Sequence, residues 1–246
     1  MTAVADALVI WHDVECGSYA TDLELWGRLA SAAGGPVLDV GAGTGRVALH
    51  LAGAGHEVVA LDLEPVLLGA LSARAAAAGL RIPTVVADAA DFELDRHDFA
   101  LVLVPMQTVQ LLAGVGARAG LLSSARRHLR AGGRLAIALA PDIQPFVPAE
   151  GELLPDPDVS ERAGWRHVSQ PLAVLSTPRG VRLERRRESF APDGSRSEEL
   201  DAIELTHLDM SRLQREGAAA GFTVEAAEEI PATHRHVGSR VVMLRA

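Results

Sequence analysis

The fold is decided by the stretch Val37-Leu38-Asp39-Val40-Gly41-Ala42-Gly43-Thr44-Gly45-Arg46. It has the pattern of a buried strand that runs into a glycine-rich turn, and the turn opens a helix. A dinucleotide-binding turn has glycine at its first, third and sixth positions, whereas the sixth position here is Arg46. The Gly-x-Gly-x-Gly spacing after Asp39 favours a ligand that carries an amino-acid end. The alternative is a glycine turn that only packs a helix on a sheet.

On both sides of this turn, apolar runs of strand length alternate with helical stretches. Such continuous runs are typical of parallel strands that helices cover on both faces. The sequence therefore predicts an α/β protein with a doubly wound, Rossmann-like and mostly parallel sheet. Glycines at position 79 and at positions 132 and 133 are expected at helix ends. The expected strands cover 36–40, 57–61, 82–87, 99–104 and 134–139, and the expected helices cover 45–54, 65–78 and 117–130.

After residue 139 the pattern changes. Prolines crowd an acidic stretch at 141–157, which predicts a loop or lid without a helix. Alternating segments then predict a small antiparallel insertion with strands at 165–176, 181–190 and 198–207. A helix at 209–220 and strands at 222–229 and 239–244 return the chain to the main sheet. We predict one domain over 1–246, with an N-terminal helical cover at 1–33, a ligand-binding core at 34–140, the lid and insertion at 141–207 and the return to the sheet at 208–246.

Composition excludes several classes of function. The chain has 246 residues, of which 48% are hydrophobic, and it contains no lysine, so a lysine nucleophile is excluded. Its net charge of −9 argues against a nucleic-acid partner. Cys16 is the only cysteine, which excludes an intrachain disulfide and fits a reducing compartment. Residues 1–10 lack a basic leader, and no apolar run is long enough to span a bilayer. We therefore predict a cytoplasmic protein with no membrane partner.

Acidic residues follow two further strands of the predicted sheet. Asp62 ends the second strand, 17 residues after Gly45, where a carboxylate can accept from both hydroxyls of a ribose. Its alternative role is to cap the helix that follows. Asp88 ends the third strand, within expected reach of an adenine amino group. Together with the glycine turn, these acids occupy three strand ends at the edge where open α/β sheets bind ligands.

These residues resemble the class I S-adenosylmethionine-dependent methyltransferases, in particular the small-molecule enzymes with a three-stranded insertion after strand five. The segments 39–45, 129–135 and 220–222 carry the resemblance, with Asp62 and Asp88. It implies S-adenosylmethionine as the cofactor, a seven-stranded sheet with a reversed last strand, and an N-terminal helix bearing Tyr19 and Asp22 that covers the cofactor. The implied cofactor-binding residues are Tyr19, Asp39, Gly41, Ala42, Gly43, Gly45, Asp62, Leu63, Asp88, Ala89, Val104 and Met106.

The expected reaction transfers a methyl group to an oxygen or nitrogen of a small metabolite. The stretch after the fourth strand lacks the Asn/Asp-Pro-Pro-Tyr motif of enzymes that methylate nucleobase or glutamine nitrogens. In-line transfer needs mainly alignment, and a base helps only if the acceptor carries a proton. A reversed last strand would bring the hairpin that holds His234 and His236 to the ligand edge. We predict these histidines and His12 as catalytic candidates, with Glu15 and His207 next in order.

Other features are expected to carry no chemistry. No metal site is predicted, because His234 and His236 with distant carboxylates form a poor ligand set. The histidines at 50, 97 and 128 and the arginine run 185–187 are expected to be solvated. Alternative functions are a cofactor-binding enzyme of the same fold with non-methylating chemistry such as cyclisation, a nicotinamide oxidoreductase, and a cofactor-sensing module. A homodimer is left open.

Overall fold

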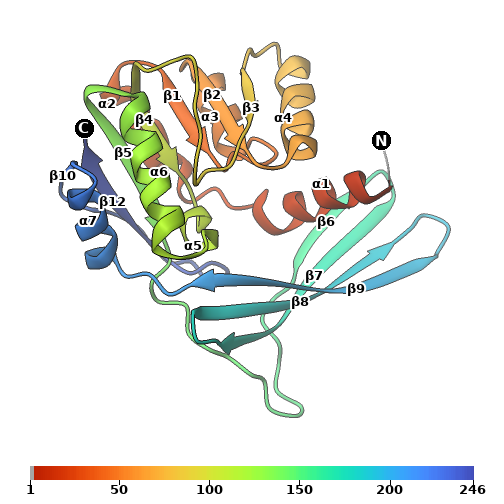
Figure 1. The fold of residues 1–246 in the computed structure, drawn as a ribbon. Coiled ribbons are helices and arrows are strands. Elements are labelled where there is room, and N and C mark those ends of the chain that lie inside the picture. The colour runs from red at the N-terminus through yellow and green to blue at the C-terminus, as the bar shows by residue number, and fades with distance from the viewer. Residues whose placement is uncertain (1–2) are drawn as a thin grey trace. The chain divides into compact units, whose positions relative to one another are not determined.

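A computed structural model describes residues 3–246, with side chains placed from residue 7 onward, and it divides the chain into two compact units (Figure 1). The first, here called the core unit, consists of Ala20–Pro141 and Leu208–Ala246. The second, here called the insertion unit, consists of Asp142–His207 and the N-terminal segment through Tyr19. The N-terminal cover predicted for 1–33 is thus divided between the units after Tyr19, and its residues 1 and 2 lie outside the described part.

The core unit is built on a sheet in the order β10-β12-β5-β4-β1-β2-β3, with β11 pairing to β12. Strands β1 to β5 are mutually parallel, and β12 runs antiparallel to β5. This arrangement confirms the predicted Rossmann-like, mostly parallel sheet with a reversed last strand. The strands are β1 Val37–Val40, β2 Val58–Asp62, β3 Thr84–Val86, β4 Phe99–Val104, β5 Leu129–Leu139, β10 Thr223–Val224, β11 Glu228–Ile230 and β12 Ser239–Arg245.

Helices cover both faces of this sheet. The path from β1 through α3 to β2 and through α4 to β3 moves along the sheet in one direction, whereas the path from β4 through α6 to β5 moves in the other. Because such crossovers are right-handed, α3 and α4 lie on one face and α6 on the opposite face, where Figure 1 also shows α7. The helices are α2 Leu23–Ala33, α3 Arg46–Gly53, α4 Pro65–Ala77, α5 Thr108–Leu111, α6 Gly114–His128 and α7 Met210–Ala219.

The reversal of direction falls between β1 and β4, which are neighbours in the sheet. Two loops that leave neighbouring strands toward opposite faces open a crevice at the carboxyl edge, where open α/β sheets bind their ligands. The glycine turn follows β1 and the loop 105–107 follows β4, so both flank this crevice. The topology therefore places the ligand edge where the sequence predicts it.

Two details of the core sheet differ from the sequence analysis. Strand β5 begins at Leu129, and the pairing jumps from Phe99–Leu129 to Leu101–Arg134, so the extra residues fold out as an irregularity. Gly132, at φ +73°, allows that irregularity, so the glycines at 132 and 133 lie within the strand rather than at a helix end. The strand predicted at 222–229 is interrupted and forms the short strands β10 and β11, so the sheet has eight strands and the expected number of seven is wrong.

A side-chain amide fixes the point where the chain leaves the core sheet. Gln110 is buried in α5, and its Oε1 accepts from the N–H of Ala140 at 2.8 Å. Nε2 of Gln110 donates to the carbonyl of Ala140 at 3.3 Å. Both backbone groups of Ala140, one residue past β5, are therefore satisfied without a neighbouring strand.

The insertion unit contains an antiparallel sheet in the order β6-β7-β8-β9 and the helix α1, which packs on β6 and β7. Three strands match the prediction, and β6 was missed because it carries only one large apolar residue, Val159, at an exposed edge. Residues 141–157 form no helix, as predicted. No helix of the described chain is long and apolar enough to span a membrane. The elements are α1 Ala3–Cys16, β6 Asp158–Arg162, β7 Trp165–Ser176, β8 Gly180–Phe190 and β9 Arg196–Thr206.

The arginine run of β8 is not a solvated face, contrary to the prediction. Arg187 donates to Glu15 of α1 through Nε at 2.7 Å and Nη2 at 2.9 Å, and its side chain is 16% exposed. Arg185 lies on the same side of the strand and is equally buried. Burial alone would raise the pKa of Glu15, but the hydrogen bond and charge of Arg187, with the charge of Arg185, hold this pKa below its usual value. Strand alternation explains the outcome, because residues two apart share a face.

Candidate functional site

The glycine turn is tied to the end of β2 by its own backbone. The N–H groups of Gly41 and Ala42 donate to the carbonyl of Leu61 at 2.8 and 3.0 Å. The N–H of Gly43 donates to Oδ2 of Asp62 at 2.8 Å, and that of Gly45 donates to the carbonyl of Ala42. These four donors are therefore already used by protein oxygens. A ligand would meet the small surface of the turn rather than a row of free N–H groups.

Glycine is required at two positions of the turn for packing within the protein. A Cβ at Gly41 would lie 2.6 Å from Cγ2 of Thr108, and a Cβ at Gly45 would lie 2.6 Å from Cγ of Leu71. Both glycines have positive φ, +75° and +96°, which side chains rarely adopt. Packing within the protein therefore accounts for glycine at these two positions. This packing does not exclude a ligand at the same turn.

Asp62 connects two turns of the structure through its carboxylate. Its Oδ2 accepts from Gly43, and its Oδ1 accepts from the N–H of Glu64 at 2.9 Å. The carboxylate thus joins the turn after β1 to the turn after β2. Each oxygen retains a further lone pair, so the same side chain can also accept from two vicinal hydroxyls. The alternative role of Asp62 was to cap helix α4. Asp62 is not the N-cap residue of this helix, because that position is occupied by Glu64.

Asp39 is a completely buried carboxyl group directly before the glycine turn. Among residues 3–246, no donor has the geometry of a good hydrogen bond to either oxygen, although the backbone N–H of Ala48 lowers the pKa of this group. Burial raises the pKa of Asp39 to about 7, against the opposing positive charge of Arg46. A buried acceptor without a well-aligned donor is rare in proteins and points to a missing partner. The ammonium group of an amino-acid end would supply the donor and the positive charge, so the residues present fit such a ligand.

Arg46, which replaces the sixth glycine of a dinucleotide turn, is held in a buried ion pair. It donates to both oxygens of Asp22 at 2.5 and 2.8 Å, and Nε1 of Trp26 donates to the same carboxylate at 2.7 Å. Asp22 is fully buried at the start of α2. This pair locks α2 onto the start of α3. The role of Asp22 as the partner of Arg46 was missed, since the two lie 24 residues apart with no local pattern.

The loop after β4 forms the second wall of the crevice. Met106 has φ +54°, a left-handed conformation that is uncommon for a residue with a side chain. Oγ1 of Thr108 donates to the carbonyl of Pro105 at 2.9 Å and closes the loop. Val104, at the end of β4, is fully buried. Strained backbone of this kind concentrates at functional sites.

The ends of β2 and β3 offer a polar and an apolar surface side by side. Val86 pairs with Asp62 in the sheet, so Asp88 lies just beyond the same edge. Asp88 is exposed and accepts from the N–H of Ala90 at 2.8 Å. Leu63 and Val86 are both exposed, which is unusual for such side chains at a sheet edge and suits the face of a flat base. Ala89, next to Asp88, is half-buried.

The hairpin with His234 and His236 lies at the carboxyl edge of the core sheet. Arg240, near the start of β12, pairs with Leu139, at the end of β5, so the loop before β12 emerges at the edge of the glycine turn. The hydroxyl of Thr233 accepts from the N–H of His236 at 3.0 Å and gives the loop its shape. His234 is exposed. The topological part of the prediction is correct, and the catalytic role of these histidines stays a prediction.

Other predicted candidates lie elsewhere. Tyr19, which is buried, and His12, which is half-buried, belong to the insertion unit, and so does the exposed His207. Their proposed roles toward the core unit stay predictions. The prediction that His128 is solvated is wrong, because His128 is completely buried and both of its ring nitrogens form hydrogen bonds. Its position at the end of α6 gave no signal of burial, whereas the histidines at 50 and 97 are exposed as expected.

The chain matches known proteins over its core and over its whole fold. Residues 37–133 match the family model described as "Methyltransferase domain". Uncharacterized proteins from Mycobacterium tuberculosis and Mycobacterium bovis are 46% identical over 70 residues. That match covers 28% of this chain and 26% of the mycobacterial proteins, about a quarter of their length.

Solved structures share the fold across almost the entire chain. Streptomyces venezuelae DesVI has a TM-score of 0.71 at 20% identity and covers 98% of both chains. CalS10, an amino pentose methyltransferase of Micromonospora echinaspora, has a TM-score of 0.69 at 22% identity, with 100% of this chain and 98% of that chain covered. The sugar N-methyltransferase KedS8 of a Streptoalloteichus species has a TM-score of 0.72 at 22% identity, over 97% and 92% of the chains. Residues 37–133 of the chain therefore match a methyltransferase domain, and the chain has the fold that these solved structures share.

Proposed function

We propose that the protein transfers a methyl group from S-adenosylmethionine to an amino nitrogen of a small, sugar-containing metabolite. The observation that carries the cofactor part is the buried Asp39, without a well-aligned donor, beside a glycine turn at the switch point of the sheet. The acceptor part is supported by the solved structures named above, two of which are an amino pentose methyltransferase and a sugar N-methyltransferase.

Each part of the cofactor has a proposed partner in the core unit. Asp39 would accept from the ammonium of the amino-acid end, which compensates the buried charge of its carboxylate. Asp62 would accept from the ribose hydroxyls while it keeps its bonds to the backbone. The adenine would contact Leu63 and Val86, with Asp88 and Ala89 near its amino group. The loop residues Val104 and Met106 complete the proposed set in this unit.

The chemistry needs little from the protein beyond alignment. When bound, S-adenosylmethionine supplies a sulfonium methyl group for in-line displacement. The loop that Met106 and Thr108 form would align an acceptor with that methyl group and exclude water. A protonated amine must lose a proton before it can attack, so we assign this task to His234 or His236, with His12 as the further candidate.

The proposal is tested with the purified full-length protein, S-adenosylmethionine and matched acceptors. Amino sugars and the same sugars with a hydroxyl in place of the amine are incubated in parallel, and mass spectrometry follows the added methyl group and the release of S-adenosylhomocysteine. We expect the amino sugars to be methylated and the hydroxyl analogues to remain unmethylated. Methylation of the hydroxyl analogues would contradict nitrogen as the target. Failure of calorimetry to detect S-adenosylmethionine binding would contradict the cofactor assignment itself.

A further inference from the structure

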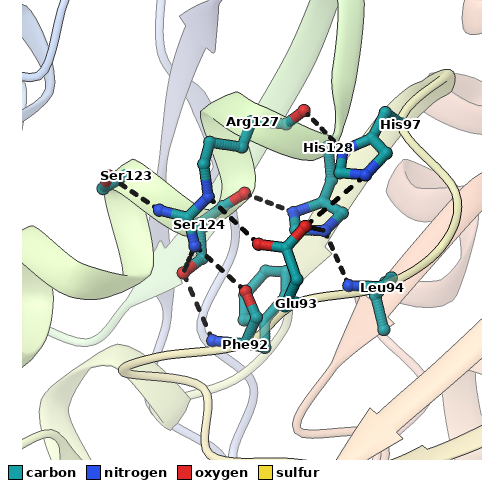
Figure 2. A network of polar contacts seen from close by, with 8 residues as sticks. All are labelled: Phe92, Glu93, Leu94, His97, Ser123, Ser124, Arg127 and His128. Carbon is teal, nitrogen blue, oxygen red and sulfur yellow. Dashed lines mark hydrogen bonds and ion pairs between the residues drawn. The ribbon is translucent and has the colours of Figure 1, made fainter.

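Figure 2 shows a second cluster of polar side chains, which contains Glu93, His97 and His128. Glu93 and His97 belong to the loop that precedes β4, and His128 ends α6 just before β5. This is the amino edge of the parallel strands, whereas the proposed cofactor residues lie at the carboxyl edge. The cluster therefore has no part in the function proposed above.

The hydrogen bonds of the two histidines fix their protons. Nδ1 of His128 lies 2.7 Å from the carbonyl of Ser124, and Nδ1 of His97 lies 3.1 Å from the carbonyl of Arg127. A carbonyl can only accept, so each Nδ1 carries a hydrogen and donates it. Each neutral ring therefore presents a lone pair at Nε2. This arrangement, with Nδ1–H bonded to a backbone carbonyl, is the one that orients histidine ligands in metal sites.

Both lone pairs meet the same carboxylate. Nε2 of His97 and Nε2 of His128 each lie 3.5 Å from Oε1 of Glu93, and the three atoms lie within 4.8 Å of one another. A carboxylate oxygen and two neutral Nε2 atoms are all acceptors, so a cation held between them would be attracted by all three. Two ligands of a tetrahedral zinc ion, each ~2.0–2.1 Å from the metal, are about 3.4 Å apart. The observed separations of 3.5 Å are close to that value.

We propose that Glu93, His97 and His128 form a binding site for a divalent transition metal of the zinc type. Two imidazoles and a carboxylate are ligands that zinc prefers, and water would complete the coordination. The bound ion would join the loop before β4 to the end of α6. It would act on stability rather than on the reaction, since the site lies at the far edge of the sheet.

Two neighbours set the strength of this site. The N–H of Leu94 donates to Nε2 of His128 at 2.9 Å, so metal binding requires this bond to be displaced. Arg127 places Nε 3.4 Å from the other oxygen of Glu93, and its positive charge opposes a second cation. His97 and Glu93 are 49% and 64% exposed, so they can adjust to an ion while His128 stays fixed. We expect a reversible site rather than one that is needed for folding.

The test uses the full-length protein without an affinity tag, stripped of metal with a chelator. Zinc chloride is titrated by calorimetry, and cobalt chloride is followed by its visible absorption, which reports coordination. We expect one zinc ion per chain and a melting temperature that rises with zinc concentration. His97→Ala and Glu93→Gln should each weaken zinc binding at least about tenfold, because even the loss of an outer-shell partner costs 10–100-fold.

Matched controls separate this site from other histidines. His50→Ala removes an exposed histidine from α3, and the double variant His234→Ala/His236→Ala removes the only His-x-His pair of the sequence. Both should bind zinc as the unchanged protein does. Two outcomes would overturn the proposal. The first is zinc binding that survives His97→Ala. The second is that the unchanged protein binds no zinc; if its melting is also pH-dependent and this dependence is lost in His97→Ala, a proton is the only cation held there.

Discussion

The substitution Asp62→Ala tests the proposed cofactor site most directly. The side chain accepts from the N–H groups of Gly43 and Glu64 in the structure, and we propose that it also accepts from the ribose hydroxyls. Removing it should therefore have two separable effects. One acts on the turn in the absence of cofactor, and the other acts on binding.

The two effects differ in size. The N–H of Glu64 is exposed and can bond to water, so the main loss to stability is the bond from Gly43. A net loss of about 1 kcal/mol is expected, which lowers the melting temperature by ~2–4 °C for a chain of this length. The lost bonds from ribose to a charged acceptor should cost about 1.5–3 kcal/mol of binding. This corresponds to an affinity loss of roughly 10- to 150-fold.

Calorimetry with S-adenosylhomocysteine measures the binding loss, and thermal melting followed by circular dichroism measures the loss of stability. Asp95→Ala is the matched control, because it removes an exposed carboxylate of the same unit at the opposite edge of the sheet. The control should leave affinity unchanged. If folded Asp62→Ala protein binds S-adenosylhomocysteine as tightly as the unchanged protein, the assignment of Asp62 to the ribose is wrong.

Three further predictions concern the turn, the buried acid and the hairpin. The pKa of Asp39 in the folded state is about 7, above its ordinary 3.8, so the folded state holds a proton that the unfolded state releases, and the free energy of unfolding decreases as the pH rises through this range. Between pH 5 and pH 8, the melting temperature should therefore fall more for the unchanged protein than for Asp39→Asn. Gly45→Ala should cost about 1–3 kcal/mol in a denaturant titration, since the new Cβ meets Leu71, and an unchanged midpoint would contradict the packing argument. His234→Ala and His236→Ala should each leave cofactor affinity unchanged. The variant that lacks the general base should have its turnover lowered by about 10²–10⁴-fold. Full activity in both variants would mean that neither is the base, and His12 would be the next candidate.

Much of the core unit could be predicted from the sequence because its signals are local. A continuous apolar run such as Phe99–Val104 specifies a strand covered on both faces, and the observed strand has the predicted bounds. The acidic strand ends were also predictable, since parallel strands bring their carboxyl ends to one edge. The fold of the core unit and the placement of Asp39, Asp62 and Asp88 toward one sheet edge followed from these two rules.

The remainder depends on contacts between segments that are distant in the sequence. The partner of Arg46 is Asp22, the partner of Arg187 is Glu15, and the burial of His128 depends on the loop at 92–94. No periodicity encodes such pairs, because each residue alone has the composition of a surface position. For this reason the sequence analysis predicts that the arginine run and His128 are solvated, and the structure shows that both predictions are wrong.

The place of β12 between β5 and β10 has a consequence for synthesis of the chain. Strand β5 ends at Leu139, and the partner that covers its open side begins at Ser239, a hundred residues later. At a synthesis rate of about 5–20 residues per second, the apolar edge of β5 stays unpaired on the ribosome for roughly 5–20 s. An unpaired apolar edge can pair with another chain during that time. The nascent protein is therefore expected to need protection from aggregation until β12 emerges.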